Sequence, residues 1–348
     1  MKIGNHEIGA GRTYIIAELS ANHNQSLETA IRTIEAAAVA GADAIKLQTY
    51  TADTITIDCK TKDFSTKEDG PWAGQTLHEL YKKAYTPWEW HAELQAIAER
   101  NGLGFFSSPF DPTAVEFLEE LNVPAYKIAS FEITDIPLIE LVASKRKPII
   151  ISTGIASEED IELALDACKR MGNDEIILLK CTSSYPAPIE EANMVMVKDM
   201  AEKYGVITGL SDHTIGSTVP IVSVCFGAKV IEKHFILDRS VGGPDASFSM
   251  NVQEFTEMVK AVREAEKAIG VINYTLTEKQ LSSRSSSRSL YVVKDIKCGE
   301  VITAENVRSI RPGFGLHPKY YKEILGKKVN KDLSKGTRLS FELIDGLN

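Results

Sequence analysis

Two apolar segments of this sequence, residues 207–213 and 230–234, each end in a histidine. Imidazole is the commonest side-chain metal ligand, and it keeps a neutral nitrogen at pH 7. A single histidine in such a place more often only forms hydrogen bonds, but His213 and His234 at matched strand ends favour a shared divalent ion. Polar residues near them in the sequence are Ser211, Asp212 and Asp245. The pattern therefore predicts a metal site.

Two lysines lie inside other apolar segments, where a positive charge needs a partner. They are Lys46 in AIKLQ and Lys127 in YKIAS, and lysine is seldom buried unpaired. They either pair with Glu18 and acidic neighbours or bind an anion. Hydroxyl groups near the lysines favour a phosphate or carboxylate ligand. The polar groups that end the segments are Gln48, Ser107, Ser108, Ser130, Ser152, Thr153, Thr182 and Ser183.

These polar residues end short apolar segments that alternate with helical patterns. The segments are 14–18, 44–48, 104–108, 126–130, 148–153, 176–183, 207–211 and 230–235. The pattern at 26–39, which is followed by Gly41 as a helix end, is typical of the connections. Eight such units predict a (β/α)8 TIM barrel, whose strands all present their carboxyl ends at one face. An open doubly wound sheet is the alternative, but no GxGxxG loop follows the first segment.

One connection is much longer than the others. Residues 49–85 follow the second strand and would lie over the face where barrel enzymes keep their sites. A loop of this size in a compact domain is usually functional or carries its own small structure. It is interpreted either as a lid that sets specificity or as a tolerated surface insertion.

The character of the chain changes after the last barrel helix, 252–269. We expect a barrel domain at 1–270, a serine-rich linker at 271–287 and a small β domain at 288–348. About 60 residues make a marginal domain, so it is expected to dock onto another surface. Its IRPGFG turn carries Arg311, and the proline and glycines next to it make a rigid turn that projects the side chain.

Composition excludes several classes of protein. The formal charge of the 348 residues is -9. The chain therefore lacks the excess of positive charge with which proteins bind nucleic acid. No apolar run is long enough to span a membrane, and the first residues lack the order of a signal peptide. The five cysteines are scattered and form no CxxC pair. A cytoplasmic, reduced location is expected.

Motifs along nearly the whole chain resemble those of the sialic acid synthases, transferases that condense phosphoenolpyruvate with an N-acetylated sugar. The matching runs are IIAELSANHNQS, AGADAIKLQTY, FFSSPFD, YKIASFE, ISTGIAS, CTSSYPAP, GLSDHT, EKHF, GGPD and IRPGFG. The C-terminal residues resemble the antifreeze-like (SAF) domain of these enzymes. YTADTITID, WAGQTLHELYKKAYTPWEWH and CTSSYPAP are most similar to the pseudaminic acid branch of the family.

The resemblance implies a role for each candidate residue. His213 and His234 match metal ligands, usually for manganese or magnesium, and Glu18 matches the carboxylate near the sugar aldehyde and the attacking water. Groups that match the phosphoenolpyruvate site are Lys46, Ser108, Lys127, Ser130, Ser152 and Ser211. Those that match sugar contacts are Gln48, Tyr185 and Asp245. The neuraminic branch has asparagine at the position of Ser183, so a phosphoenolpyruvate contact there departs from the family pattern.

The resemblance also implies an assembly, in which Arg311 enters the barrel of a partner subunit in a domain-swapped homodimer. The expected reaction joins phosphoenolpyruvate and water to a 6-deoxy, 2,4-diacetamido sugar of the altrose series, giving pseudaminate and phosphate by C–O cleavage. N-acetylneuraminate or legionaminate synthase is an alternative, because loops read the far end of the sugar. A non-catalytic glycan- or ice-binding protein is an alternative of another class.

Overall fold

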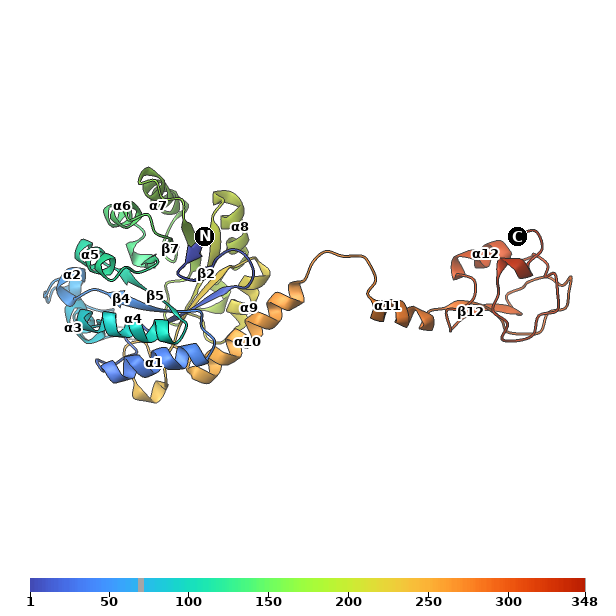
Figure 1. Ribbon diagram of the computed structural model, residues 1–348, viewed down its shortest axis with the longest axis horizontal. Helices are drawn as coiled ribbons and strands as arrows, with labels where there is room; N and C mark the ends of the chain where they lie inside the picture. Colours follow the sequence, from blue (N-terminus) through green and yellow to red (C-terminus); the bar gives the residue numbers. More distant parts are fainter. Residues whose placement is uncertain (68–71, 348) are drawn as a thin grey trace. The chain divides into compact units, whose positions relative to one another are not determined.

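The computed structural model describes residues 1–67 and 72–347. The chain forms two compact units, Met1–Gly270 and Val271–Asn348, which appear in Figure 1 in blue to orange and in orange to red.

Eight parallel strands of the first unit close into a barrel in the order β10-β3-β4-β5-β6-β7-β8-β9. The strands are β3 (Tyr14–Glu18), β4 (Ala44–Thr49), β5 (Gly104–Pro109), β6 (Tyr126–Ile128), β7 (Ile149–Ser152), β8 (Ile176–Cys181), β9 (Ile207–Asp212) and β10 (Val230–His234). The predicted (β/α)8 barrel is therefore confirmed. A short antiparallel hairpin, β1 (Lys2–Ile3) and β2 (His6–Glu7), precedes it.

Each barrel strand leads to a helix that covers the outside of the barrel (Figure 1). These helices are α1 (Leu27–Val39), α4 (His91–Arg100), α5 (Pro112–Glu120), α6 (Ile136–Ser144), α7 (Glu158–Arg170), α8 (Val195–Tyr204), α9 (Thr218–Cys225) and α10 (Val252–Ile269). Side-chain caps fix several starts, because the first backbone N–H groups of a helix lack partners. Ser157 begins α7 with a capping box to Asp160, and Asn251 begins α10 with one to Glu254.

The closure of the barrel sets the register of the residues that matter for the site. His234 of β10 lies opposite Glu18 of β3, and Glu18 lies opposite Lys46 of β4. His234, Glu18 and Lys46 therefore lie side by side at the same level of three neighbouring strands. In β9, a Cβ on Gly209 would lie 2.2 Å from the Val230 carbonyl oxygen, so only glycine lets β9 and β10 approach at this point.

The long connection after β4 carries its own small elements. They are α2 (Ala52–Ile55), the 3-10 turn η1 (Lys62–Phe64), α3 (Leu77–Ala84) and the turn η2 (Trp88–Trp90), and residues 68–71 lie outside the described part. Trp72 donates a hydrogen bond from Nε1 to the carbonyl oxygen of Pro244 at 2.9 Å. The connection therefore returns to the loop that follows β10.

The second unit is a small β domain preceded by a short helix. Its elements are α11 (Glu278–Ser283), η6 (Arg284–Ser286), β11 (Ser289–Val292), β12 (Val307–Ile310), η7 (Pro318–Tyr320), α12 (Tyr321–Ile324) and η8 (Phe341–Leu343). The core is apolar and includes Leu290, Val292, Ile296, Ile302, Val307, Val329 and Ile344. Among the described residues of both units, no helix is long and apolar enough to cross a membrane.

Candidate active site

Four ionisable side chains from different strands meet inside the barrel. Each is only 1–5% exposed: Glu18, Lys46, Lys127 and Glu232. The Lys46 ammonium lies 2.9 Å from Glu18 Oε2 and 3.5 Å from Glu232 Oε1. The Lys127 ammonium also lies 3.5 Å from Glu232 Oε1. Two buried positive charges are thus balanced by two buried carboxylates, which is the pairing that burial requires.

Serine hydroxyls lie next to these charges. Ser108 Oγ accepts a hydrogen bond from the Lys46 ammonium at 3.3 Å, and Ser211 Oγ donates one to Glu232 Oε1 at 3.1 Å. Ser130 Oγ accepts from the Gly154 N–H at 3.1 Å. A Cβ on Gly154 would lie 2.1 Å from Ser183 Oγ and 2.6 Å from Ser130 Oγ. Glycine at this position is what allows the hydroxyls to converge.

Two further buried hydroxyl groups form no hydrogen bond with any of the described residues. Ser152 Oγ and Ser183 Oγ have no partner in that part of the chain. Buried polar atoms are normally satisfied. The Oγ atoms of these two serines are therefore available to a ligand.

Glu18 is held by two neighbours on the adjacent strand. Gln48 Nε2 donates to its Oε1 at 2.9 Å, and the Lys46 ammonium pairs with its Oε2. Burial raises the pKa of Glu18 to about 7; the charge of Glu232 adds to this rise, while Lys46 opposes it. Burial lowers the pKa of Lys46, but the two carboxylates outweigh that effect and raise it. The neighbouring ammonium groups favour the ionised form of both carboxylates, and they hold the pKa of Glu232 below its usual value despite burial.

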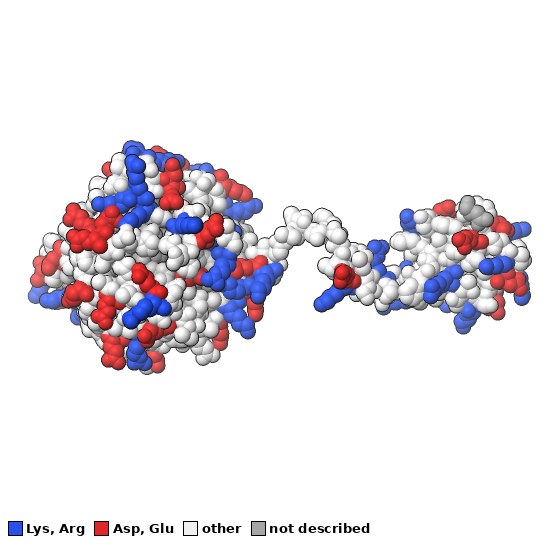
Figure 2. All heavy atoms as spheres, viewed as in Figure 1, with Lys and Arg blue, Asp and Glu red and all other residues white. Residues whose placement is uncertain are grey.

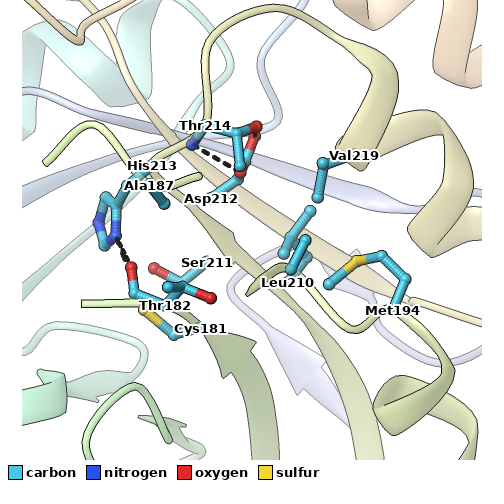
Figure 3. A pocket seen from close by; sticks show the side chains of 11 residues that line it. Cys181, Thr182, Ala187, Met194, Leu210, Ser211, Asp212, His213, Thr214 and Val219 are labelled. Atoms are coloured by element: carbon cyan, nitrogen blue, oxygen red, sulfur yellow. Dashed lines mark hydrogen bonds between the residues drawn. The ribbon is translucent and has the colours of Figure 1, made fainter. Parts of the chain in front are cut away.

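The two histidines lie side by side, with ring centroids 5.4 Å apart. His213 Nδ1 donates to the Thr182 carbonyl oxygen at 3.0 Å (Figure 3), which leaves the Nε2 lone pair free. A hydrogen bond of this kind orients metal-binding histidines in general. His234 Nδ1 is buried without a partner in the described chain and lies 3.9 Å from Asp245 Oδ2. Burial lowers the pKa of His234 well below its usual value, so the ring is neutral, as a ligand must be.

The two adjacent imidazole rings fit a metal ion that keeps open positions, because each can offer a neutral nitrogen. Within residues 1–67 and 72–347, however, no group of three or more His, Cys, Asp and Glu is arranged so that it could hold a metal ion. A small cavity of about 10 Å³ lies beside His213, between strands β8 and β9 (Figure 3).

An aromatic wall lies beside the histidines. The ring centroid of Tyr185 lies 4.3 Å from the centroid of His213. It lies 5.1 Å from the centroid of Phe248 and 5.7 Å from that of Trp72. Asp245 is buried next to this wall, and its Oδ2 accepts from the Ala21 N–H at 3.4 Å. The long connection thus contributes an aromatic side chain beside the site.

The structure brings the candidate residues of the barrel to its C-terminal end, but Arg311 belongs to the second unit. There it lines an open hollow of about 470 Å³ with Lys279, Arg284 and several serines. The Gly313 N–H donates to the Ser285 carbonyl oxygen at 2.8 Å, so the serine-rich segment supports the turn that carries Arg311.

Sequence reasoning missed the buried residues Cys181, Lys233 and Glu232 near the site, and the half-buried carboxylate Glu132. Glu232 could have been found, because it lies two residues before His234 and so shares its face of β10. Glu132 follows Ser130 in the YKIASFE run; burial raises its pKa to about 7, and its Oε2 has no partner among the described residues. Cys181 Sγ lies 3.7 Å from His213 Nδ1, a contact that no sequence pattern indicated.

Comparison with known proteins places these residues in context. The NeuB family model matches residues 33–274, and the SAF domain model matches residues 287–344. The chain is 49% identical to a pseudaminic acid synthase of Campylobacter jejuni, over 97% of this chain and 98% of that protein. It is 48% identical to one of Helicobacter pylori, over 95% and 97%.

More distant relatives share the same extent of chain. An N,N'-diacetyllegionaminic acid synthase of Legionella pneumophila is 37% identical over 95% of this chain and 94% of that protein. The solved N-acetylneuraminic acid (sialic acid) synthetase of Leptospira borgpetersenii, in complex with citrate, is 30% identical, with a TM-score of 0.71. That match covers 81% of this chain and 94% of the other.

Proposed function

Because this chain belongs to the NeuB family, we propose that it is a pseudaminic acid synthase. It condenses phosphoenolpyruvate and water with a 6-deoxy, 2,4-diacetamido sugar of the altrose series and releases phosphate. The observation that carries this proposal is the cluster of two buried lysines beside two histidines at the strand ends, in a chain that matches pseudaminic acid synthases over nearly its full length.

Phosphoenolpyruvate carries a carboxylate and a phosphate, and the lysine cluster is suited to both. Lys46 and Lys127 share the two carboxylates of the resting site, so a bound anion adds partners to ammonium groups that are already desolvated. Hydroxyls complete the anion site: Ser108, Ser130, Ser152, Ser183 and Ser211. The free Oγ atoms of Ser152 and Ser183 support this assignment.

We assign the divalent ion, Mn²⁺ or Mg²⁺, to His213 and His234. The free Nε2 of His213 and the unpartnered Nδ1 of His234 support this assignment. When bound, the ion supplies Lewis acidity that polarises the sugar aldehyde. The chain's own contribution is the orientation of the two rings, through the Thr182 carbonyl and the approach of Asp245.

The chemistry then follows from charge. Carbon 3 of phosphoenolpyruvate forms a bond to the aldehyde carbon, the π electrons of the aldehyde move to its oxygen, which takes up a proton, and positive charge develops at carbon 2. Glu18 accepts a proton from the water that adds to carbon 2. The tetrahedral intermediate loses phosphate as the C–O bond breaks. Lys46 and Lys127 neutralise the negative charge of the substrate throughout, which is preorganised electrostatic stabilisation.

The sugar is assigned to the side of the site that carries Gln48, Tyr185 and Asp245. Trp72 and Tyr185 offer apolar surface to the methyl group of a 6-deoxy sugar. Trp88 does not contribute to this wall, because it packs on Phe117 and donates to the Tyr50 carbonyl. One apolar contact discriminates by roughly 1–3 kcal/mol, so acceptor choice rests on the sum of several contacts.

We further propose a domain-swapped homodimer in which the partner subunit's Arg311 contacts the acetamido carbonyls of the sugar. Charge supports this assembly: residues 271–348 hold 14 Lys and Arg against 8 Asp and Glu, a formal +6, whereas the remaining 25 and 40 give -15. Figure 2 shows acidic and basic side chains on both units, so the difference between the units lies in their net charge. Complementary charge favours association of such surfaces. The expected location is the cytoplasm.

The test is a side-by-side assay with phosphoenolpyruvate and a panel of acceptors, read by phosphate release and product mass. The proposal expects the fastest turnover with the 6-deoxy, 2,4-diacetamido altrose sugar. Faster turnover with N-acetylmannosamine, or with the legionaminate precursor, would assign the chain to those branches. Absence of phosphate release with every acceptor would leave the binding-protein alternative, which thermal hysteresis and glycan binding would then examine.

A further inference from the structure

The residues that immediately precede the two histidines form a buried ion pair. Asp212 comes before His213 and Lys233 comes before His234, and the two lie opposite each other in the β9–β10 ladder. The side chains of Asp212 and Lys233 are each 1% exposed, and the Lys233 ammonium lies 2.5 Å from Asp212 Oδ2. Side chains alternate between the two faces of a strand, so this pair lies on the face opposite Glu232 and His234.

The same pair also fixes the chain on the far side of His213. Asp212 Oδ1 accepts a hydrogen bond from the Thr214 N–H at 3.0 Å (Figure 3), which closes a turn around His213. The Lys233 ammonium donates to the Thr214 carbonyl oxygen as well. One ammonium group therefore holds both chain neighbours of His213 and is itself one residue from His234.

A second cross-strand contact lies one step earlier, on the inner face. Ser211 Oγ donates to Glu232 Oε1, and Ser211 and Glu232 are also ladder partners. Two successive rungs of the ladder thus carry polar side-chain links, one on each face, directly before the histidines. Neighbouring strands with links on both faces resist both sliding and rotation.

We propose that Asp212 and Lys233 are a positioning pair that fixes the spacing of His213 and His234 and so determines the affinity of the site for a divalent cation. This inference rests on the proposed metal role of the histidines. The stability of the fold does not explain why this ion pair is present. Well-packed apolar residues can often replace a buried ion pair without loss of stability. Groups that orient metal ligands commonly change metal affinity 10- to 100-fold when they are replaced.

Two double variants test the proposal. Asp212→Asn with Lys233→Met removes the ion pair but keeps an oxygen for the Thr214 N–H, whereas Asp212→Leu with Lys233→Met removes both. Neither leaves an unpaired buried charge. The control is Glu119→Gln with Lys147→Met, which removes an ion pair of the same barrel between side chains that are 32% and 22% exposed.

The readout is Mn²⁺ binding to the substrate-free protein by calorimetry, with thermal unfolding of the metal-free protein as a check of the fold. We expect both double variants to bind Mn²⁺ roughly 10- to 100-fold more weakly than wild type, while the control binds as wild type does. A folded variant with Asp212→Asn and Lys233→Met that keeps wild-type Mn²⁺ affinity would overturn the inference. If neither double variant folds, the single variant Lys233→Arg, which keeps the charge, replaces them. Its Mn²⁺ affinity, measured by the same calorimetry, then decides whether the pair has a positioning role.

The wild-type protein separates this inference from the proposed function. If wild type binds Mn²⁺ no better than His213→Ala or His234→Ala, the proposed metal role fails, and the positioning role fails with it. If wild type binds Mn²⁺, the histidine variants do not and the double variants bind normally, only the positioning role fails. At saturating Mn²⁺, a positioning defect should lower kcat more than it raises the KM of phosphoenolpyruvate.

Discussion

Glu232 Oε1 lies 3.5 Å from the ammonium of Lys46 and 3.5 Å from that of Lys127, so one carboxylate oxygen separates two buried positive charges. Without it, Lys127 would lose its only ion-pair partner among the described residues. The carboxylate therefore balances both ammonium groups, and we predict that it keeps the lysines in place for an anionic substrate.

Glu232→Gln should destabilise the ligand-free protein by about 3 kcal/mol, because removal of one partner leaves a buried charge uncompensated. Phosphoenolpyruvate should then raise the melting temperature of the variant more than that of wild type, since its charge replaces the lost carboxylate. Thermal unfolding with and without phosphoenolpyruvate measures both effects. Glu119→Gln is the control on the barrel exterior. Equal shifts in variant and wild type would show that the lysines do not bind the substrate anion.

His213→Ala and His234→Ala should abolish turnover while the fold survives, because ligands of an open metal site contribute little core packing. A chelator should inhibit wild type, and added Mn²⁺ should restore activity. Phosphate release and circular dichroism report activity and fold. Full activity after exhaustive chelation would remove the metal from the mechanism.

The proposed attack of water at carbon 2 makes a prediction about isotopes. In water enriched in oxygen-18, label should enter the sugar product and be absent from the released phosphate. Mass spectrometry of both products decides the point. Label in phosphate would mean P–O cleavage, and the role assigned to Glu18 would have to be withdrawn.

Arg311→Ala should raise the KM of the sugar roughly 10- to 100-fold, the effect of losing a charged hydrogen bond, and should leave the KM of phosphoenolpyruvate nearly unchanged. Mixing Arg311→Ala and His234→Ala subunits should recover activity, because one site of a swapped heterodimer has both residues. Subunit exchange must be shown separately by mass. An inactive mixture after proven exchange would exclude action of Arg311 in trans.

Acid should destabilise the barrel through two histidines outside the site. Burial lowers the pKa of His23 and of His91 to about 4, from 6.5 in the unfolded chain. Between these values the unfolded chain binds protons that the folded chain does not, so stability falls as pH drops from about 6.5 to about 4. Each histidine contributes a loss of roughly 3 kcal/mol over that window.

The matched variant for this prediction is His91→Gln, whose amide oxygen can still accept from the Thr49 hydroxyl that contacts His91 Nε2 at 2.9 Å. Its free energy of unfolding should depend less on pH than that of wild type between about pH 4 and pH 6.5. Urea denaturation followed by tryptophan fluorescence measures the barrel alone, because Trp72, Trp88 and Trp90 all lie in it. The prediction would be contradicted if the free energy of unfolding depended on pH equally in wild type and in His91→Gln.

The sequence allowed the barrel to be predicted because each strand is a short apolar run with a polar end. The same rule brought Glu18, Lys46 and Lys127 to one face, since parallel strands present their carboxyl ends together. The pattern could not decide what the lysines bind. In the structure they contact Glu18 and Glu232, and the anion that we assign to them remains a prediction.

Other parts of the site depend on information that the local pattern does not hold. Asp212 and Lys233 read as polar residues at strand ends, and only their register and packing reveal an ion pair that is 1% exposed. Trp72 lies far along the chain from Tyr185, and the path of a long connection is set by loop contacts such as that with Pro244. Such contacts have no periodicity from which they could be predicted.

The register that places His234 opposite Glu18 joins the last strand of the barrel to the first. During synthesis on the ribosome, β3 emerges long before β10, and until the two pair, both expose unsatisfied strand edges. The lysines and carboxylates cannot yet balance one another in this period. The nascent chain is therefore without its binding centre and open to aggregation until almost the whole barrel has been made, which gives a chaperone that shields strand edges a defined interval in which to act.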